Sequence, residues 1–246
     1  MKLPLYTAVA IIAATGCAGT RTKAKEAVQA NLSIPVAAIA KPSFQPAVSK
    51  KMQAGELPPD RAAQACNKTA EELEKRGFDI EAVAHYERAR QLVPSTADIA
   101  WRLAMAQDRL GNEKAAAEEF AKALAIAPNN ADLLNDAGYF FTAWGDLKTA
   151  EKHLKEAIRI RADHANAWAN LGTLYAKSNR LPEAETAFGK VMAPAQVSYN
   201  LGVVLAGQGQ AIPAKKRFQY ALALDPEFAA AKEALANIPA SSSIVQ

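Results

Sequence analysis

The sequence predicts an all-α protein built as a solenoid of about five helical hairpins, and two observations support this prediction. Ala and Leu dominate the apolar half of the composition, with 7% aromatic residues and little β-branched clustering, which favours helix over sheet. Turn residues also recur at a fixed step: Gly77, Gly111, Gly145 and Asn179 lie 34 residues apart, and Gly209 follows after 30. A constant period of this length is typical of stacked helical repeats.

Each repeat is expected to contain two antiparallel helices whose backbones approach closely at small residues. In the fourth repeat, for example, Gly172 on the first helix would meet Ala184 on the second, and large side chains would fill the remaining space. Stacking of neighbouring repeats would bury the apolar face that a single hairpin leaves exposed. The expected small residues are Gly138, Gly172, Gly202, Ala150, Ala184 and Ala214, and the large ones are Phe120, Trp168, Tyr175, Phe188 and Phe218.

The residues at fixed repeat positions resemble the tetratricopeptide repeat family. The first repeat is the most divergent, with Cys66 where Trp is often found. The resemblance implies a right-handed superhelical solenoid over residues 61–226, followed by a capping helix and polar tail over 227–246. The fourth repeat is four residues short, either as a tolerated deletion or as a functional bend. Signature residues include Leu103, Phe120 and Pro128 in the second repeat, Leu134, Gly138 and Leu154 in the third, Trp168, Leu171, Gly172, Tyr175, Ala184 and Phe188 in the fourth, and Leu201, Gly202, Phe218 and Pro226 in the fifth.

The N-terminus indicates export. Lys2 precedes an apolar stretch from Leu3 to Ala14, which is too short to span a bilayer as a permanent helix. The segment ending in Gly16 and Cys17 resembles the lipobox of bacterial lipoproteins, which implies a signal peptide over residues 1–16 and a fatty acyl group such as palmitate on Cys17. Ala18, in place of Asp, is associated in that family with the outer membrane, facing the periplasm. An ordinary secreted protein cleaved nearby and an uncleaved anchor are the alternatives.

Residues 17–60 are predicted to be a linker, because they contain five prolines and no sustained apolar period. The positive charge of the chain is concentrated before residue 61. Residues 61–246 contain 22 basic and 22 acidic side chains, although the whole chain has a formal net charge of +4. Nucleic acid is therefore not an expected partner, since the repeats have no excess of cations to neutralise phosphates.

The sequence offers no candidate for catalysis or metal binding. Three histidines are scattered along the chain, and we find no metal-ligand motif, phosphate-binding glycine loop or nucleophile motif. Cys66 falls on a repeat core position and is expected to be a small buried hydrophobe. We expect a protein that is not an enzyme, has no cofactor or bound metal, and takes no small-molecule substrate.

In tetratricopeptide arrays the first helix of each repeat lines the concave face, and by repeat register this face is the predicted binding site. Aromatic and Met side chains offer contact area, and Asn side chains both donate to and accept from a peptide backbone. Alternatively, Asn170 and Asn200 serve packing between repeats and Trp101 is simply buried. The Lys, Asn and Arg clamp that chaperone-binding relatives use for a carboxylate is absent. The predicted groove residues are Trp101, Arg102, Met105, Asn135, Asp136, Tyr139, Asn170, Thr173, Tyr199 and Asn200.

The combination of a lipobox-like signal, a linker and repeats resembles, in architecture only, the pilotin and Tad pilus assembly lipoproteins. It implies an envelope-anchored adaptor that binds other proteins or peptides during assembly of a pilus or secretion system. The alternatives are a scaffold for cell-wall (peptidoglycan) enzymes and, in a different class, a non-catalytic subunit of an enzyme complex.

Overall fold

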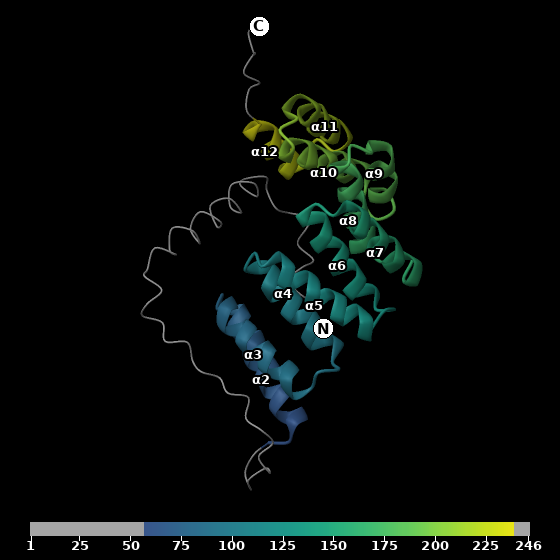
Figure 1. Cartoon of the computed structure of the whole chain (residues 1–246). Coiled ribbons are helices and arrows are strands. Elements are labelled where there is room, and N and C mark those ends of the chain that lie inside the picture. Colours follow the sequence, from purple (N-terminus) through teal and green to yellow (C-terminus); the bar gives the residue numbers. More distant parts are fainter. Residues whose placement is uncertain (1–56, 239–246) are drawn as a thin grey trace. The chain divides into compact units, whose positions relative to one another are not determined.

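The computed structural model describes residues 57–238, and this part of the chain holds eleven α-helices and no strand (Figure 1). The predicted signal peptide, Cys17, nearly all of the linker and the tail from Pro239 lie outside the described residues. The helices are α2 (Pro59–Lys75), α3 (Asp79–Leu92), α4 (Ala97–Arg109), α5 (Glu113–Ile126), α6 (Ala131–Trp144), α7 (Leu147–Ile160), α8 (Ala165–Lys177), α9 (Leu181–Phe188), α10 (Pro194–Gly207), α11 (Ala211–Leu224) and α12 (Ala229–Asn237).

The predicted hairpins are confirmed. Helices α2 and α3, α4 and α5, α6 and α7, α8 and α9, and α10 and α11 pack as consecutive pairs. The residue at each predicted turn has a positive φ, which a side chain with a Cβ rarely adopts. Asn179 is the one non-glycine residue among them, at φ 58°, and Asn tolerates this region better than most residues.

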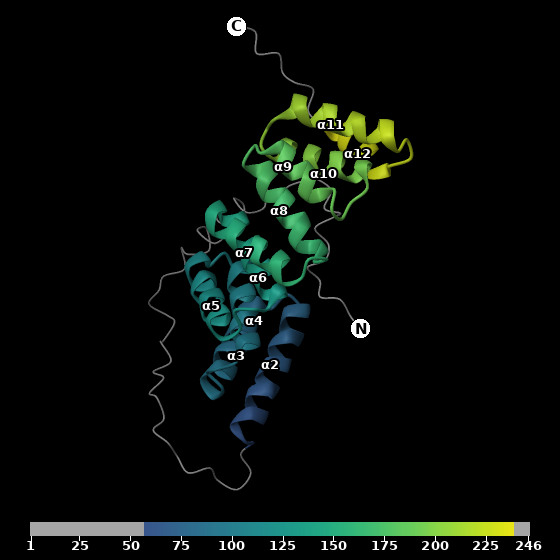
Figure 2. The ribbon, with the colours of Figure 1, turned by 90° about the vertical axis from the view of Figure 1, so that its right-hand side faces the viewer.

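The chain divides into two compact units, which are described separately: residues 57–192 with α2 to α9, and residues 193–238 with α10 to α12. In the first unit the first helices contact one another, as α6 and α8 do, and the second helices are linked by ion pairs such as Arg90 of α3 with Glu119 of α5. Figure 2 shows α2 lying beside its partner α3. The first unit is therefore two layers of helices, with the core between them.

Close helix packing at glycine is confirmed at Gly172. A Cβ added there would lie 2.6 Å from Cδ1 of Phe188, whose side chain is only 1% exposed. A Cβ at Gly138 would likewise lie 2.5 Å from Cγ of Leu154. The glycines are thus required by the contact between the two helices of a repeat rather than by backbone conformation.

The second unit is a hairpin with a short third helix. Tyr199 of α10 is 5% exposed, and its ring lies 5.7 Å from that of Phe218 and 5.1 Å from that of Phe228. The hydroxyl of Ser198 donates to the backbone carbonyl of Arg217 at 2.8 Å, which joins the two long helices. Helix α12 packs on α11 and buries Ala231, as expected for a capping helix.

One helix boundary differs from the expected one, and the second helix of the fourth repeat is shorter than those of the other repeats. Helix α2 begins at Pro59, inside the segment predicted to be linker, because a proline in the first turn needs no N–H partner. Helix α9 ends at Phe188 and has eight residues, in the repeat that is four residues short. The amides of Val191 and Met192 both donate to the carbonyl of Phe188, forming tight turns before Pro194 opens α10. The shortened helix directly precedes the boundary between the two units.

Candidate protein-binding face

Eight of the ten predicted groove residues lie on the first helices of the first unit, and together they define what we call the first-helix face. Residues at equal repeat positions recur on successive helices, so that the side chains form rows along the stack. The members are Trp101, Arg102 and Met105 of α4, Asn135, Asp136 and Tyr139 of α6, and Asn170 and Thr173 of α8.

A chain of hydrogen bonds joins four of these residues across three helices. The Asn170 side-chain amide donates to Oδ1 of Asn135 at 2.9 Å, and the Asn135 amide donates to Oδ1 of Asp136 at 3.0 Å. From the other side, the Trp101 indole donates to Oδ2 of Asp136 at 3.1 Å. Asn135 and Asn170 are 5% and 7% exposed, so their amides join the repeats to one another. The structure therefore supports the alternative in which Asn170 serves packing between repeats.

The pKa of Asp136 is raised to about 6. Burial is the main cause, because it disfavours the charged carboxylate, and the nearby negative charge of Asp132 acts in the same direction. The hydrogen bonds from Asn135 and Trp101 lower the pKa and partly offset the effect of burial. The network therefore contains a carboxylate that is incompletely stabilised in its ionised form.

The remaining members provide the accessible part of the face. Tyr139 is 37% exposed, and Met105, Arg102 and Thr173 are partly buried. The Thr173 hydroxyl donates to the carbonyl of Ala169 at 3.0 Å within its own helix. Arg102 is held by carboxylates, since its Nε donates to Asp98 at 2.9 Å. Tyr139 and Met105 are thus the principal apolar contact groups of the first-helix face.

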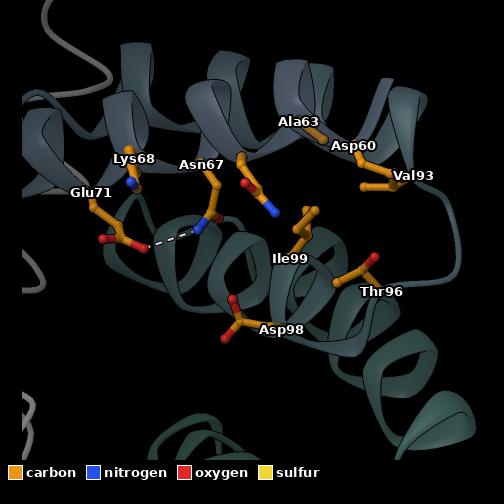
Figure 3. A pocket seen from close by; sticks show the side chains of 10 residues that line it. Asp60, Ala63, Asn67, Lys68, Glu71, Val93, Thr96, Asp98 and Ile99 are labelled. Atoms are coloured by element: carbon orange, nitrogen blue, oxygen red, sulfur yellow. Dashed lines mark hydrogen bonds between the residues drawn. The ribbon is translucent and has the colours of Figure 1, made fainter. Parts of the chain in front are cut away.

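A cavity of about 480 Å³ lies between α2 and α4, at the N-terminal end of the same row of first helices (Figure 3). The Asn67 amide donates to Oε1 of Glu71 at 2.9 Å on its wall. None of the residues that line this cavity is among the predicted groove residues, although Asn67 occupies the same repeat position as Trp101 and Asn135. The lining residues are Asp60, Ala63, Gln64, Asn67, Lys68 and Glu71 of α2, Val93 and Thr96 of the following loop, and Asp98 and Ile99 of α4.

The other two predicted groove residues, Tyr199 and Asn200, lie on α10 in the second unit. The Tyr199 ring is part of the core of that unit, and burial raises its pKa. The Asn200 side chain donates to the carbonyl of Gln196 one turn earlier, at 2.8 Å. Tyr199 therefore packs inside the second unit and does not offer the contact surface that was predicted for a partner.

Cys66 packs against a cluster of Ala63, Ala89 and Ile99, but it is only partly buried, whereas the repeat position predicted a buried residue. Within residues 57–238, His, Cys, Asp and Glu side chains form no group of three or more that could hold a metal ion. Over the same residues, every helix is too short or too polar to span a membrane.

Comparison with known proteins agrees with this geometry. A family model described as tetratricopeptide repeat matches residues 142–199, and one described as YpiA-like, C-terminal tetratricopeptide repeats matches residues 98–163. The peroxisomal targeting signal receptor of Candida albicans is 33% identical over 125 residues, which is 48% of this chain and 20% of the receptor. The chain thus spans about a fifth of the length of this curated relative.

Several solved structures have a similar fold. YrrB, described as a TPR protein with an unusual peptide-binding site, is 24% identical, with a TM-score of 0.53 over 70% of this chain and 91% of YrrB. The pilF protein of Pseudomonas aeruginosa is 24% identical, with a TM-score of 0.54 over 68% and 77% of the two chains. MamA of Desulfovibrio magneticus is 19% identical, with a TM-score of 0.57 over 68% and 97%. The chain contains tetratricopeptide repeats and has the all-α fold of proteins built from them.

Proposed function

We propose that this chain is a non-enzymatic adaptor that binds partner proteins or peptides on the first-helix face and is tethered to the bacterial envelope through a lipid on Cys17. The observation that supports binding most directly is the combination of a rigid polar network with exposed contact groups. Asn170, Asn135, Asp136 and Trp101 join three first helices by hydrogen bonds of 2.9 to 3.1 Å, and Tyr139 lies beside them on α6.

Rigidity matters because binding is opposed by the entropy lost when side chains and loops become ordered. The hydrogen bonds of the first-helix face fix the helix spacing before a partner arrives, so that less ordering is needed on binding. Tyr139 offers a large contact area with few rotatable bonds, as aromatic residues in binding hot spots do. The cavity beside Asn67 and Glu71 adds a recess at one end of the same row.

The proposed location follows from the N-terminal sequence. The run from Ala14 to Cys17 resembles a lipobox, and the proline-containing segment after it would let the repeats stand away from the outer membrane. The architectural resemblance to pilotins favours a partner in pilus or secretion-system assembly. The fold likeness to pilF of Pseudomonas aeruginosa is compatible with that choice. Recovery of peptidoglycan enzymes in place of pilus or secretin components would favour the cell-wall scaffold.

The test compares two exposed side chains of similar accessibility. Tyr139 on α6 is 37% exposed, and Ile126 at the end of α5, a second helix, is 43% exposed. Tagged full-length chains with Tyr139→Ala or Ile126→Ala are expressed in the native cell, crosslinked, and recovered from solubilised membranes. We expect Tyr139→Ala to reduce partner recovery about tenfold, the effect of losing a contact worth 1 to 2 kcal/mol, and Ile126→Ala to leave it unchanged. Equal recovery by both variants would contradict the proposed binding face.

A further inference from the structure

The carboxylates on the first helices differ in how their charge is compensated. Glu71 of α2 lies 3.3 Å from Nη1 of Arg102, and Asp98 of α4 accepts from Nε of the same arginine at 2.9 Å. Asp132 of α6 forms an ion pair with Arg161. Asp136 has no Lys, Arg or His nitrogen within ion-pair distance among residues 57–238. Both printed hydrogen-bond partners of Asp136, the Asn135 amide and the Trp101 indole, are neutral.

The hydrogen bonds around Asp136 have a fixed direction. The oxygen of the Asn135 side chain accepts from Asn170, so its amide nitrogen must point toward Asp136. A flip of the Asn135 amide would lose both bonds and place its oxygen against the carboxylate. The Trp101 indole has one N–H and can only donate. The network therefore ends on Asp136 as its acceptor.

The two donors to Asp136 carry no charge that would compensate its carboxylate. Each carboxylate oxygen of Asp136 accepts one hydrogen bond, Oδ1 from the Asn135 amide and Oδ2 from the Trp101 indole. Burial of a charge is costly unless it is paired, and bonds from neutral donors are weaker than bonds from a cation. The raised pKa of Asp136 agrees with this imbalance.

We propose that Asp136 selects a cationic side chain, Lys or Arg, of the partner segment bound on the first-helix face. This inference rests on the proposed function. An ammonium or guanidinium group would add a charge-assisted hydrogen bond to Asp136, which is stronger than the bonds from its two neutral donors. Tyr139 lies one turn along α6 and Met105 lies one turn beyond Trp101 on α4, so apolar surface is available for the stem of a Lys or Arg.

The first experiment is selection from a library of immobilised octapeptides. The purified full-length chain is incubated at pH 7.5 with peptides that carry Lys, Arg, norleucine or Glu at each position in turn. For the wild type we expect about tenfold enrichment of Lys or Arg over norleucine at one position. Asp136→Asn should reduce this enrichment to less than about twofold. The matched control is Glu118→Gln, which removes one negative charge from an exposed position on α5 and should retain the wild-type preference.

The second experiment needs no variant and therefore does not depend on the folding of Asp136→Asn. A selected Lys peptide is coupled to the wild-type chain with a zero-length carbodiimide, which forms an amide between Lys Nζ and a carboxylate in contact with it. Mass spectrometry should locate the new bond at Asp136. A bond formed at Glu71 or Asp98 in its place would overturn the inference.

The outcomes separate this inference from the proposed function. Wild-type chains that retain peptides without a preference for basic residues would overturn the role of Asp136 and leave the binding face standing. If Asp136→Asn keeps the wild-type preference for Lys or Arg, the role of Asp136 is likewise overturned and the binding face still stands. Wild-type chains that retain no peptide above the level of bare resin would contradict peptide binding on the first-helix face itself, and the role of Asp136 with it.

Discussion

Replacement of Gly172 by Ala tests the packing of the repeats most sharply, because the change adds a single methyl group. Gly172 lies on α8, and an added Cβ would lie 2.6 Å from Cδ1, 2.7 Å from Cε1 and 2.8 Å from Cγ of Phe188 on α9. Carbon atoms in contact are separated by about 3.5 to 4.0 Å, so the ring would have to retreat by roughly 1 Å. Phe188 is 1% exposed, so its ring can move only by displacing neighbouring side chains.

The expected magnitude is the difference between two opposing effects. Overpacking of a filled core costs about 1 to 3 kcal/mol, whereas Ala is favoured over Gly inside a helix by about 1 kcal/mol. Gly172→Ala should therefore lower the free energy of unfolding by up to about 2 kcal/mol. Gly207 provides the matched control, because it lies on α10 with nothing within 4 Å of an added Cβ. Gly207→Ala should be neutral or stabilising by up to about 1 kcal/mol.

The assay is urea unfolding followed by far-UV circular dichroism, with amide hydrogen exchange to locate the loss of protection. Exchange should accelerate in α8 and α9 of Gly172→Ala. In a Phe188→Leu background, the added methyl group should cost less, since the clashing ring is gone. Gly172→Ala should be less stable than Gly207→Ala by about 1 to 3 kcal/mol, the cost of overpacking alone, and equal stability of the two variants would show that the close approach of α8 and α9 described above is wrong.

Three further predictions concern other parts of the chain. Between about pH 4 and pH 7, the free energy of unfolding of Asp136→Asn should rise by about 2 to 3 kcal/mol relative to that of the wild type. The folded-state pKa of Asp136 is raised from 3.8 to about 6. The stability that the protonated side chain contributes is therefore present below about pH 4 and lost as the pH rises through about 6. Urea unfolding of both chains across this range measures the difference, and a constant difference would contradict it. Asn179→Ala should cost about 1 kcal/mol because φ is 58° at this position, whereas Asn179→Gly should cost less or stabilise, and their melting temperatures will show the order. Cys17→Ser should move the protein from the membrane fraction to the soluble periplasmic fraction and abolish labelling by a fatty acid; persistent labelling would exclude the proposed anchor.

The fold was predictable because its determinants are local and periodic. The 34-residue recurrence of turn residues located each hairpin, and every predicted turn residue has a positive φ. The close contact at Gly172 followed from the small residue and the aromatic residue at their repeat positions. The end of α9 was not predictable in the same way, because Gly189 and the residues before Pro194 leave the helix for tight turns that no repeat position encodes.

The site was less predictable, because repeat position indicates which face a side chain lies on but not what it contacts. Asn135 and Tyr139 are one turn apart, yet one is 5% exposed in a hydrogen-bond network and the other is 37% exposed. Tyr199 occupies the same repeat position as Asn135, but it packs against Phe218 and Phe228. Replacement of Asn135 or Asn170 would therefore disturb helix packing, and exposed residues such as Tyr139 are better probes of binding.

The central claim is that partners bind the first-helix face, and site-specific photocrosslinking in the native cell tests it most directly. A benzophenone amino acid is placed at Tyr139 in one strain and at Ile126, on the second-helix layer, in another. Benzophenone reacts only with groups in contact with it, so the adducts report which layer touches the partner. We predict an adduct of defined mass from position 139 that is absent from position 126. An adduct from position 126 with none from position 139 would contradict the account.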